Sequence, residues 1–128
     1  MSLTAADILS SSGKYPERAA VATADVIANA AETAARVNKL GLTALSVSSG
    51  FRPATINVHV KGAAVRSHHI MGRAVDLVDA DGSIGKWCLA NLDALEKAGL
   101  WLEDPSYTKV WCHLQTVPPK SGKRVFQP

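Results

Sequence analysis

Two short segments of this sequence carry side chains that could hold a metal ion. The segment Ser67–Asp76 (SHHIMGRAVD) and the later segment Trp111–His113 together supply imidazoles and a carboxylate. Two imidazoles and one carboxylate are ligands of the kind that hold a catalytic Zn²⁺ and leave one coordination position open for water. The residue types therefore indicate a catalytic metal site and not a sealed structural one.

The spacing of the first two candidates indicates which elements position them. His69 and Asp76 are seven residues apart, whereas a metal-binding helix places its ligands at i and i+4. A loop that runs into a strand suits the spacing, with one ligand on each. Gly72 and Ala74 lie between the two candidates, where bulkier side chains would be expected if the segment only filled a core.

The surrounding pattern predicts both strands and helices. Alternation of apolar and polar side chains predicts a half-buried strand at 45–49, and further short strands are expected at 74–78, 100–102 and 110–114. Helices are expected from the Thr4–Asp7 capping box to about residue 10, from Pro16 to about Lys39, and from a Ser83 cap to Ala98. The long alanine-rich helix should pack on the sheet, and the tail from Pro118 should be ordered but irregular.

Composition limits the class of protein. With 128 residues, 47% of them hydrophobic and 20% charged, the chain should form one domain, residues 1–128. The net charge of +3 fits polyanionic partners such as cell-wall polymers or nucleic acid and selects neither. The longest apolar stretches fall far short of the ~18 residues of a membrane span, so no membrane partner is expected. The N-terminal segment has no charged region followed by an apolar one, which predicts cytoplasmic synthesis without a signal peptide.

On these residues the chain resembles the zinc D-alanyl-D-alanine carboxypeptidase and L-alanyl-D-glutamate endopeptidase family, which cleaves peptidoglycan stem peptides. The family motif Ser-x-His-x-x-Gly-x-Ala-x-Asp is matched at every fixed position from Ser67 to Asp76. A Trp-x-His element is matched at Trp111–His113, and an upstream Ser-Gly-Tyr/Phe-Arg element at Ser49–Arg52. The three elements occur in the family's order over about residues 45–116.

The resemblance implies a fold, a cofactor and a reaction. It implies an α+β fold in which a small antiparallel sheet carries the zinc site and packs against the N-terminal long helix and a second helix. It implies that His69, Asp76 and His113 bind one Zn²⁺, whose water hydrolyses a stem-peptide bond. Arg52 would hold a substrate carboxylate or stabilise charge on the tetrahedral intermediate, a surface arginine after a turn being the alternative.

The general base departs from the family pattern. Members often carry an acid three residues before the last histidine, and here that position is Val110, which cannot transfer a proton. The nearest acids are Glu103 and Asp104, which a hairpin-like return of the chain could bring beside the metal. A solvated acidic turn is the alternative for both, and His68 is a further candidate.

Other residues in or near the two segments are expected to support the site or the core. Ser67 is expected to position backbone or substrate through its hydroxyl. Trp111 and Gln115 should share the strand face of His113 and contact substrate, although packing is an equal alternative for the tryptophan. Cys112 should point away from that face, and both it and Cys88 are expected to be reduced, buried thiols, a disulfide being the alternative.

Three functions are compatible with these observations. The first is a zinc metallopeptidase acting on peptidoglycan peptide, with a bacteriophage endolysin or virion-associated lysin as the expected setting. The second is a non-catalytic zinc-containing virion, structural or cell-wall-binding protein of the same fold, which the missing acid at Val110 would explain. The third is a nucleic-acid-binding module, supported only by Lys120, Lys123 and Arg124 in the tail, so no nucleic acid is expected.

Overall fold

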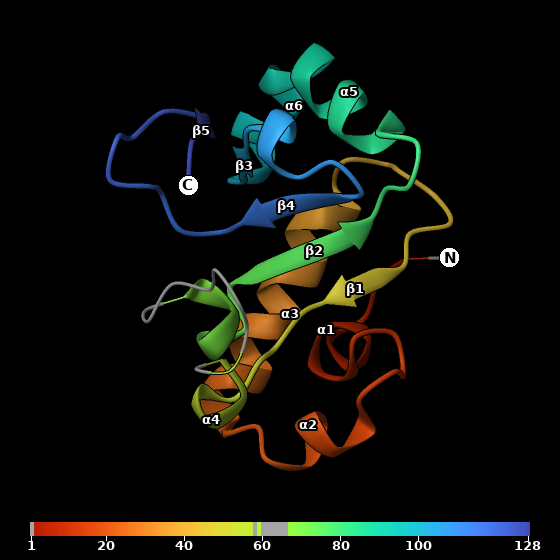
Figure 1. Ribbon diagram of the computed structural model, residues 1–128, viewed down its shortest axis with the longest axis vertical. Helices are drawn as coiled ribbons and strands as arrows, with labels where there is room; N and C mark the ends of the chain where they lie inside the picture. Colours follow the sequence, from red (N-terminus) through yellow and green to blue (C-terminus); the bar gives the residue numbers. More distant parts are fainter. Residues whose placement is uncertain (1, 58, 60–66) are drawn as a thin grey trace.

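A mixed α+β architecture surrounds one central sheet in the computed structural model, which describes residues 2–57, 59 and 67–128 (Figure 1). The sheet has five strands in the order β1-β2-β4-β3-β5. Their bounds are β1 (Val47–Ser49), β2 (Ala74–Val78), β3 (Trp101–Glu103), β4 (Trp111–Gln115) and β5 (Val125–Phe126). The four strands predicted from the sequence are therefore confirmed to within about two residues at each end.

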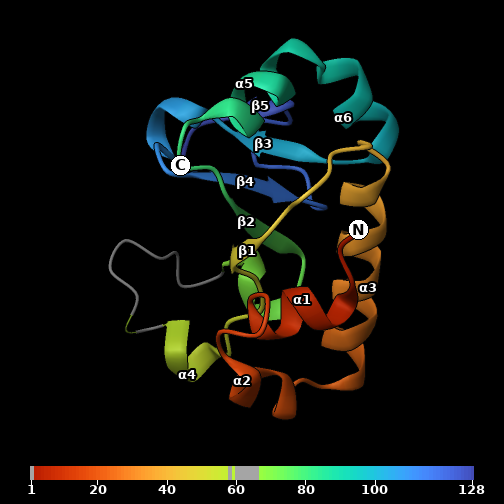
Figure 2. The same ribbon diagram turned by 90° about the vertical axis from the view of Figure 1, so that its right-hand side faces the viewer.

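Helices of the described residues lie beside the sheet and at both of its ends (Figures 1 and 2). They are α1 (Ala5–Ser10), α2 (Pro16–Ala20), α3 (Ala24–Asn38), α4 (Ala54–Asn57), α5 (Ser83–Ala90) and α6 (Leu92–Ala98), with the 3₁₀ turns η1 (His68–Met71) and η2 (Pro105–Tyr107). In Figure 2, α3 runs along one side of the sheet, α1 lies near β1, and α5 and α6 lie near β3. None of these helices is both long and apolar enough to cross a membrane.

The long N-terminal helix predicted from Pro16 to Lys39 is wrong, because the chain leaves the helical path after α2. Thr23 has an extended backbone, and its side-chain oxygen accepts a hydrogen bond from the Val26 N–H at 3.3 Å. This N-cap satisfies a donor that the first turn of α3 would otherwise leave free. Alanine-rich periodicity continues through the break, which hid the cap in the sequence.

The helix predicted from Ser83 to Ala98 is also two helices. Asn91 leaves the helical conformation at φ −130°, and its side chain donates to the Trp87 carbonyl at 2.8 Å. Asparagine competes with helical hydrogen bonding in this way, which explains the interruption. The expected Ser83 cap is wrong too, because the Asp79 carboxylate accepts from the N–H groups of Ile84 and Gly85.

The prediction for the first helix is confirmed, whereas the prediction of an irregular tail is wrong for its last strand. The capping box at the start of α1 is confirmed, since the Thr4 and Asp7 side chains each accept from the other's backbone N–H. The tail, in contrast, is not wholly irregular. Val125 and Phe126 pair in parallel with Leu102 and Glu103, so the expectation of a purely antiparallel sheet is corrected at this edge.

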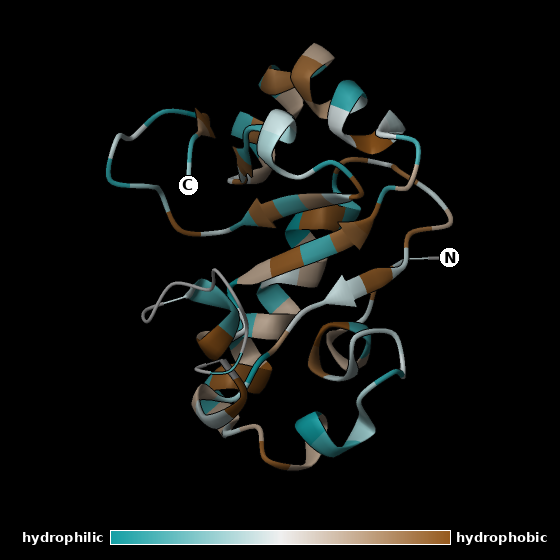
Figure 3. Ribbon diagram, viewed as in Figure 1, coloured by the Kyte–Doolittle hydropathy of each residue, from teal (hydrophilic) through white to brown (hydrophobic). Residues whose placement is uncertain are grey.

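The two faces of the sheet differ in chemistry. Cross-strand register pairs Val75 with Leu114 and Leu77 with Cys112 on one face, which joins the apolar core. The intervening residues of β2 and β4 point to the other face, because successive strand side chains alternate. Figure 3 shows a single hydrophilic band within the otherwise hydrophobic β2. The second face carries the candidate metal ligands.

Candidate metal centre

Asp76 and His113 form a directly opposed pair on neighbouring antiparallel strands. The register of β2 and β4 places their Cα atoms opposite one another. Opposed side chains on one face have Cβ atoms about 4.5–5.5 Å apart, close enough for polar groups to meet. His113 Nδ1 lies 2.8 Å from Asp76 Oδ1, and Asp76 is itself largely buried. Two of the three predicted ligands are therefore brought together by strand register alone.

His69 comes from η1, the short turn that precedes β2. The Ser67 hydroxyl accepts from the His69 N–H at 3.2 Å and so caps the turn. Gly72 ends it with φ +73°, and a Cβ there would lie 2.9 Å from the Val26 carbonyl oxygen of α3. Only glycine combines this left-handed backbone with so close an approach to the helix. The packing of η1 against α3 therefore explains why a glycine stands between the two candidate ligands.

The α3 helix holds the end of this turn by two further hydrogen bonds. The Thr33 hydroxyl donates to the Gly72 carbonyl at 2.8 Å, and the Asn29 amide donates to the Met71 carbonyl at 2.9 Å. Sequence analysis predicted only a packing role for this helix. Its polar side chains nevertheless fix the segment that carries His69.

Gly50 orients the His69 ring from the other side. Its carbonyl oxygen lies 2.8 Å from His69 Nδ1. A Cβ at Gly50 would collide with the Ile8 carbonyl, and the next residue, Phe51, donates its N–H to that same carbonyl at 2.8 Å. The Ser49–Arg52 element thus brings a backbone oxygen against the imidazole. Sequence reasoning missed this role, because a main-chain acceptor has no side-chain signature.

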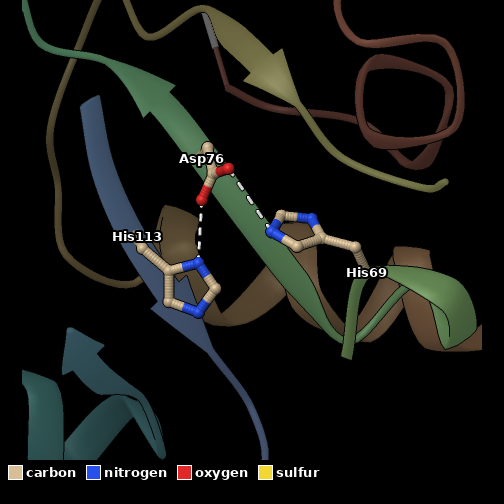
Figure 4. Close-up of side chains that lie close together, drawn as sticks. All are labelled: His69, Asp76 and His113. Atoms are coloured by element: carbon tan, nitrogen blue, oxygen red, sulfur yellow. Dashed lines mark hydrogen bonds and ion pairs between the residues drawn. The ribbon is translucent and has the colours of Figure 1, made fainter. Parts of the chain in front are cut away.

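The three candidate ligands converge on one point on the face of the sheet (Figure 4). His69 Nε2 lies 3.4 Å from Asp76 Oδ2, and one ligand atom from each residue lies within 4.8 Å of the other two. The two imidazole rings meet edge to face with centroids 5.3 Å apart. The structure thus brings together the three residues that the sequence nominated as ligands.

The donor chemistry of this cluster suits a cation. A carbonyl can only accept, so His69 Nδ1 carries a hydrogen that it donates to Gly50, and the neutral ring presents the lone pair of Nε2 to the cluster. On the other side of the Asp76 carboxylate, His113 presents Nδ1. Imidazole nitrogens and a carboxylate oxygen form a ligand set that zinc accepts. These residues fit a metal ion.

The electrostatics of the cluster point the same way. Burial acts to raise the pKa of Asp76, but the His69 charge and hydrogen bonds from both histidines lower it well below its usual range. Burial acts to lower the pKa of His113, but the hydrogen bond to Asp76 and the charge of that carboxylate raise it overall. A carboxylate held ionised between two imidazoles is a negative site that a cation can occupy in place of protons.

Glu103 and Asp104, the two predicted proton-transfer residues, lie in different environments. Glu103 is the last residue of β3, one position beyond the pair of Leu102 with Leu114, which puts it on the face of His113. Burial raises the pKa of Glu103, as does the Asp76 charge, while the His113 and His69 charges oppose the rise. Asp104 lies beyond the strand, where its carboxylate caps η2 by accepting from the Ser106 N–H at 2.9 Å.

Arg52 lies beside the candidate metal ligands. The backbone N–H of Arg52 donates to the His69 carbonyl at 3.1 Å, and its side-chain Nη2 donates to the Ser67 hydroxyl at 3.3 Å. Burial lowers the pKa of Arg52, and the nearby Asp76 charge opposes that shift. Its Nε is buried without a hydrogen-bond partner in the part of the chain that the structure describes. Ser67 thus links the guanidinium to the His69 turn.

The remaining predicted site residues lie around His113. Trp111, half-buried, flanks it on the same face of β4, and Gln115, buried, accepts from His113 Nε2 at 2.8 Å. Val110 is 60% exposed and offers no polar group. His68 is partly buried on η1, and burial lowers its pKa, assisted by the charges of His113, Arg73 and His69.

Two further observations concern neighbours of the site. Cys112 points to the core against Cys88, both are free, and their hydrogen bond together with burial raises the pKa of the Cys112 thiol. The prediction of buried thiols without a disulfide between them agrees with the structure. Phe126 packs against the His113 ring at 83° with centroids 6.0 Å apart. The sequence missed it, because a two-residue strand in a tail shows no periodicity.

Comparison with known proteins identifies the family. The family model described as Peptidase M15 matches residues 1–99, so the chain belongs to the M15 peptidases, a family of metallopeptidases. The match includes Arg52, His69 and Asp76 and ends before β3 and β4. Searches of curated proteins and of solved structures gave no match. His113 and Glu103 are therefore assigned from geometry and motif, outside the matched residues.

Proposed function

We propose that this chain is a zinc-dependent peptidase that hydrolyses peptide bonds in peptidoglycan stem peptides. The observation that carries the proposal is the convergence of His69, Asp76 and His113 in a chain of the M15 family. When bound there, Zn²⁺ would supply an activated water near neutral pH and polarise the scissile carbonyl. The motif resemblance over residues 45–116 supports the cell-wall substrate.

Glu103 is the proposed general base. Its position on the face of His113 and its raised pKa suit a carboxylate that takes a proton from the attacking water and returns it to the leaving amine. Asp104 is the weaker candidate, because its carboxylate is engaged by the Ser106 N–H at the start of η2. Glu103, on the adjacent strand β3, would in this way replace the acid that many family members carry at the position of Val110.

Arg52 is the proposed anion-binding residue. A stem peptide carries carboxylates, and the guanidinium beside the ligands has a buried Nε that no described residue accepts from. It can bind a substrate carboxylate or the developing oxyanion, while Ser67 holds its Nη2 in place. Trp111 remains proposed as a further substrate contact on β4, whereas the amide of the buried Gln115 is already engaged by His113 and Val117.

The test is hydrolysis of purified peptidoglycan by the zinc-loaded protein. We expect newly released amino groups and stem-peptide fragments identifiable by mass spectrometry, and no release after zinc is removed by a chelator or with the His113→Ala variant. Mass spectrometry also reports which bond is cut. Stoichiometric zinc without any released product would leave the alternative, a non-catalytic zinc protein that binds the wall, which the apolar Val110 favours.

A further inference from the structure

Gln115 occupies a buried position directly beside a metal ligand. It lies two residues after His113 on β4, on the same face, with only 4% of its surface exposed. Its cross-strand neighbours are Ala74 on β2 and Trp101 on β3. An uncharged polar side chain buried between two strands needs hydrogen-bond partners, and those partners reveal its role.

Both ends of the Gln115 amide are engaged. Its Nε2 donates to the Val117 carbonyl at 2.7 Å, and its Oε1 lies 2.8 Å from His113 Nε2. The Val117 carbonyl can only accept, so the NH₂ group must face it and the amide oxygen must face the imidazole. The short loop after β4 therefore determines which way the amide is turned.

The orientation of the amide determines the proton position on His113. An amide oxygen only accepts, so His113 Nε2 must carry a hydrogen. In the neutral ring the lone pair is then on Nδ1, the nitrogen 2.8 Å from Asp76. A ring hydrogen-bonded in this manner is the usual arrangement behind a metal-binding histidine.

We propose that Gln115 is a positioning residue that fixes the tautomer and the orientation of His113, so that Nδ1 is the nitrogen available to the metal ion. The inference rests on the proposed metal site and adds to it the chain Val117–Gln115–His113. His69 is held equivalently by the Gly50 carbonyl, but a backbone oxygen cannot be removed by substitution. Gln115 is thus the side chain through which the orientation of one ligand can be tested.

The decisive experiment compares zinc affinity, measured by competition with a chromophoric chelator, between the wild type and two variants. Gln115→Met keeps the length of the side chain and removes the acceptor, so affinity should fall about 10- to 100-fold, the usual cost of losing an outer-shell partner. Gln115→Glu keeps an acceptor for His113 Nε2–H and should lose clearly less. Equal affinity of Gln115→Met and wild type, or equal losses in both variants, would overturn the proposal.

A matched control separates orientation from general damage to the fold. Asn38 is another amide that bridges two backbone groups, the N–H and the carbonyl of Leu3, away from the ligands. Asn38→Leu should lower the melting temperature and leave zinc affinity unchanged. Loss of affinity in Asn38→Leu as large as in Gln115→Met would attribute the effect to instability and sink the proposed role.

A spectroscopic measurement on the wild type does not depend on any variant folding. In ¹⁵N-labelled, zinc-loaded protein, long-range ¹H–¹⁵N spectra should show hydrogen on His113 Nε2 and a metal-bound Nδ1. Coordination through Nε2 would refute the inference while leaving the metal site intact. Failure of the wild type to bind zinc would instead refute the proposed function itself.

Discussion

The two faces of strands β2 and β4 differ in role: one packs in the apolar core, and the other carries the candidate metal ligands. On one face, Val75, Leu77 and Leu114 are fully buried in the apolar core. On the other, Asp76 and His113 meet across the same strand pair at 2.8 Å. The core face holds the register of the strands, and the register holds the ligands opposite one another. Stability and chemistry are therefore separated by the alternation of side chains along the strand.

Removal of a ligand should have the largest effect and should be confined to the polar face. His69→Ala or His113→Ala leaves two of three ligands, so zinc affinity should fall by more than the roughly 100-fold cost of an outer-shell change. Hydrolysis of peptidoglycan should be lost with it. Zinc content after dialysis and product release measure both effects. His59→Ala, which alters an exposed histidine, should leave both unchanged, and retention of zinc by both ligand variants would refute the assignment.

Loss of the proposed base should separate metal binding from turnover on that same face. Glu103→Gln should lower turnover about 10²- to 10⁴-fold, because no group then accepts the proton of the attacking water. Zinc stoichiometry should stay at the wild-type value. Asp104→Asn is the matched change on the neighbouring residue and should retain turnover, since asparagine can still cap η2. The opposite pattern, with Asp104→Asn inactive and Glu103→Gln active, would transfer the role to Asp104.

The sequence alone predicted the polar face well and its surroundings less well. The short, mostly apolar segment AVDLV and the motif spacing predicted β2 and the three candidate ligands, because both are patterns visible in the sequence. Glu103 and Asp104 could not be separated, since they are adjacent in the chain. Only the register of β3 with β4 shows that Glu103 lies on the face of the site, whereas Asp104 lies beyond the strand and caps η2. Long-range pairing of this kind leaves no periodic trace in the sequence.

Several predictions about helix bounds, the tail and the surroundings of the ligands failed for a related reason. The helix breaks at Thr23 and Asn91 depend on single side-chain hydrogen bonds inside otherwise helical stretches. β5 forms because β3 offers an edge, not because two tail residues favour a strand. The acceptor roles of Gly50 and Val117 belong to backbone carbonyls, which every residue carries. Positioning of the ligands was thus the part of the site that required the structure.

A substitution on the opposite face should reverse the pattern of the first two. Leu77, fully buried and adjacent to Asp76, contributes nothing polar. Leu77→Ala should lower the free energy of unfolding by about 2–5 kcal/mol through lost packing and a residual cavity. Zinc affinity measured well below the melting temperature should stay near the wild-type value. Val78→Ala, at a position 46% exposed, should cost far less. A loss of zinc affinity in Leu77→Ala as severe as in His113→Ala would show that the two faces are not separable.

The smallest expected effect is a dependence of stability on pH, which arises from the protonation of His113. The pKa of His113 in the folded, metal-free protein is raised above its usual 6.5, so protonated His113 stabilises that form below pH 6.5. This contribution is lost as pH rises through the folded pKa. The lowered pKa of Asp76 contributes stability above about its ordinary 3.8, which is lost only in acid.

The stability that a bound metal adds should change with pH in the opposite direction to the stability that protonated His113 adds, because a metal ion competes with the His113 proton for Nδ1. Between pH 6 and 8 the metal-free protein should become less stable. The additional stability given by zinc should grow over the same interval, by at most about 1.4 kcal/mol per pH unit for each proton displaced. Thermal unfolding with and without zinc at each pH measures the difference. If that difference stays flat or shrinks as pH rises, the proton on His113 is not what the metal replaces, and the cation must bind elsewhere than between the two strands.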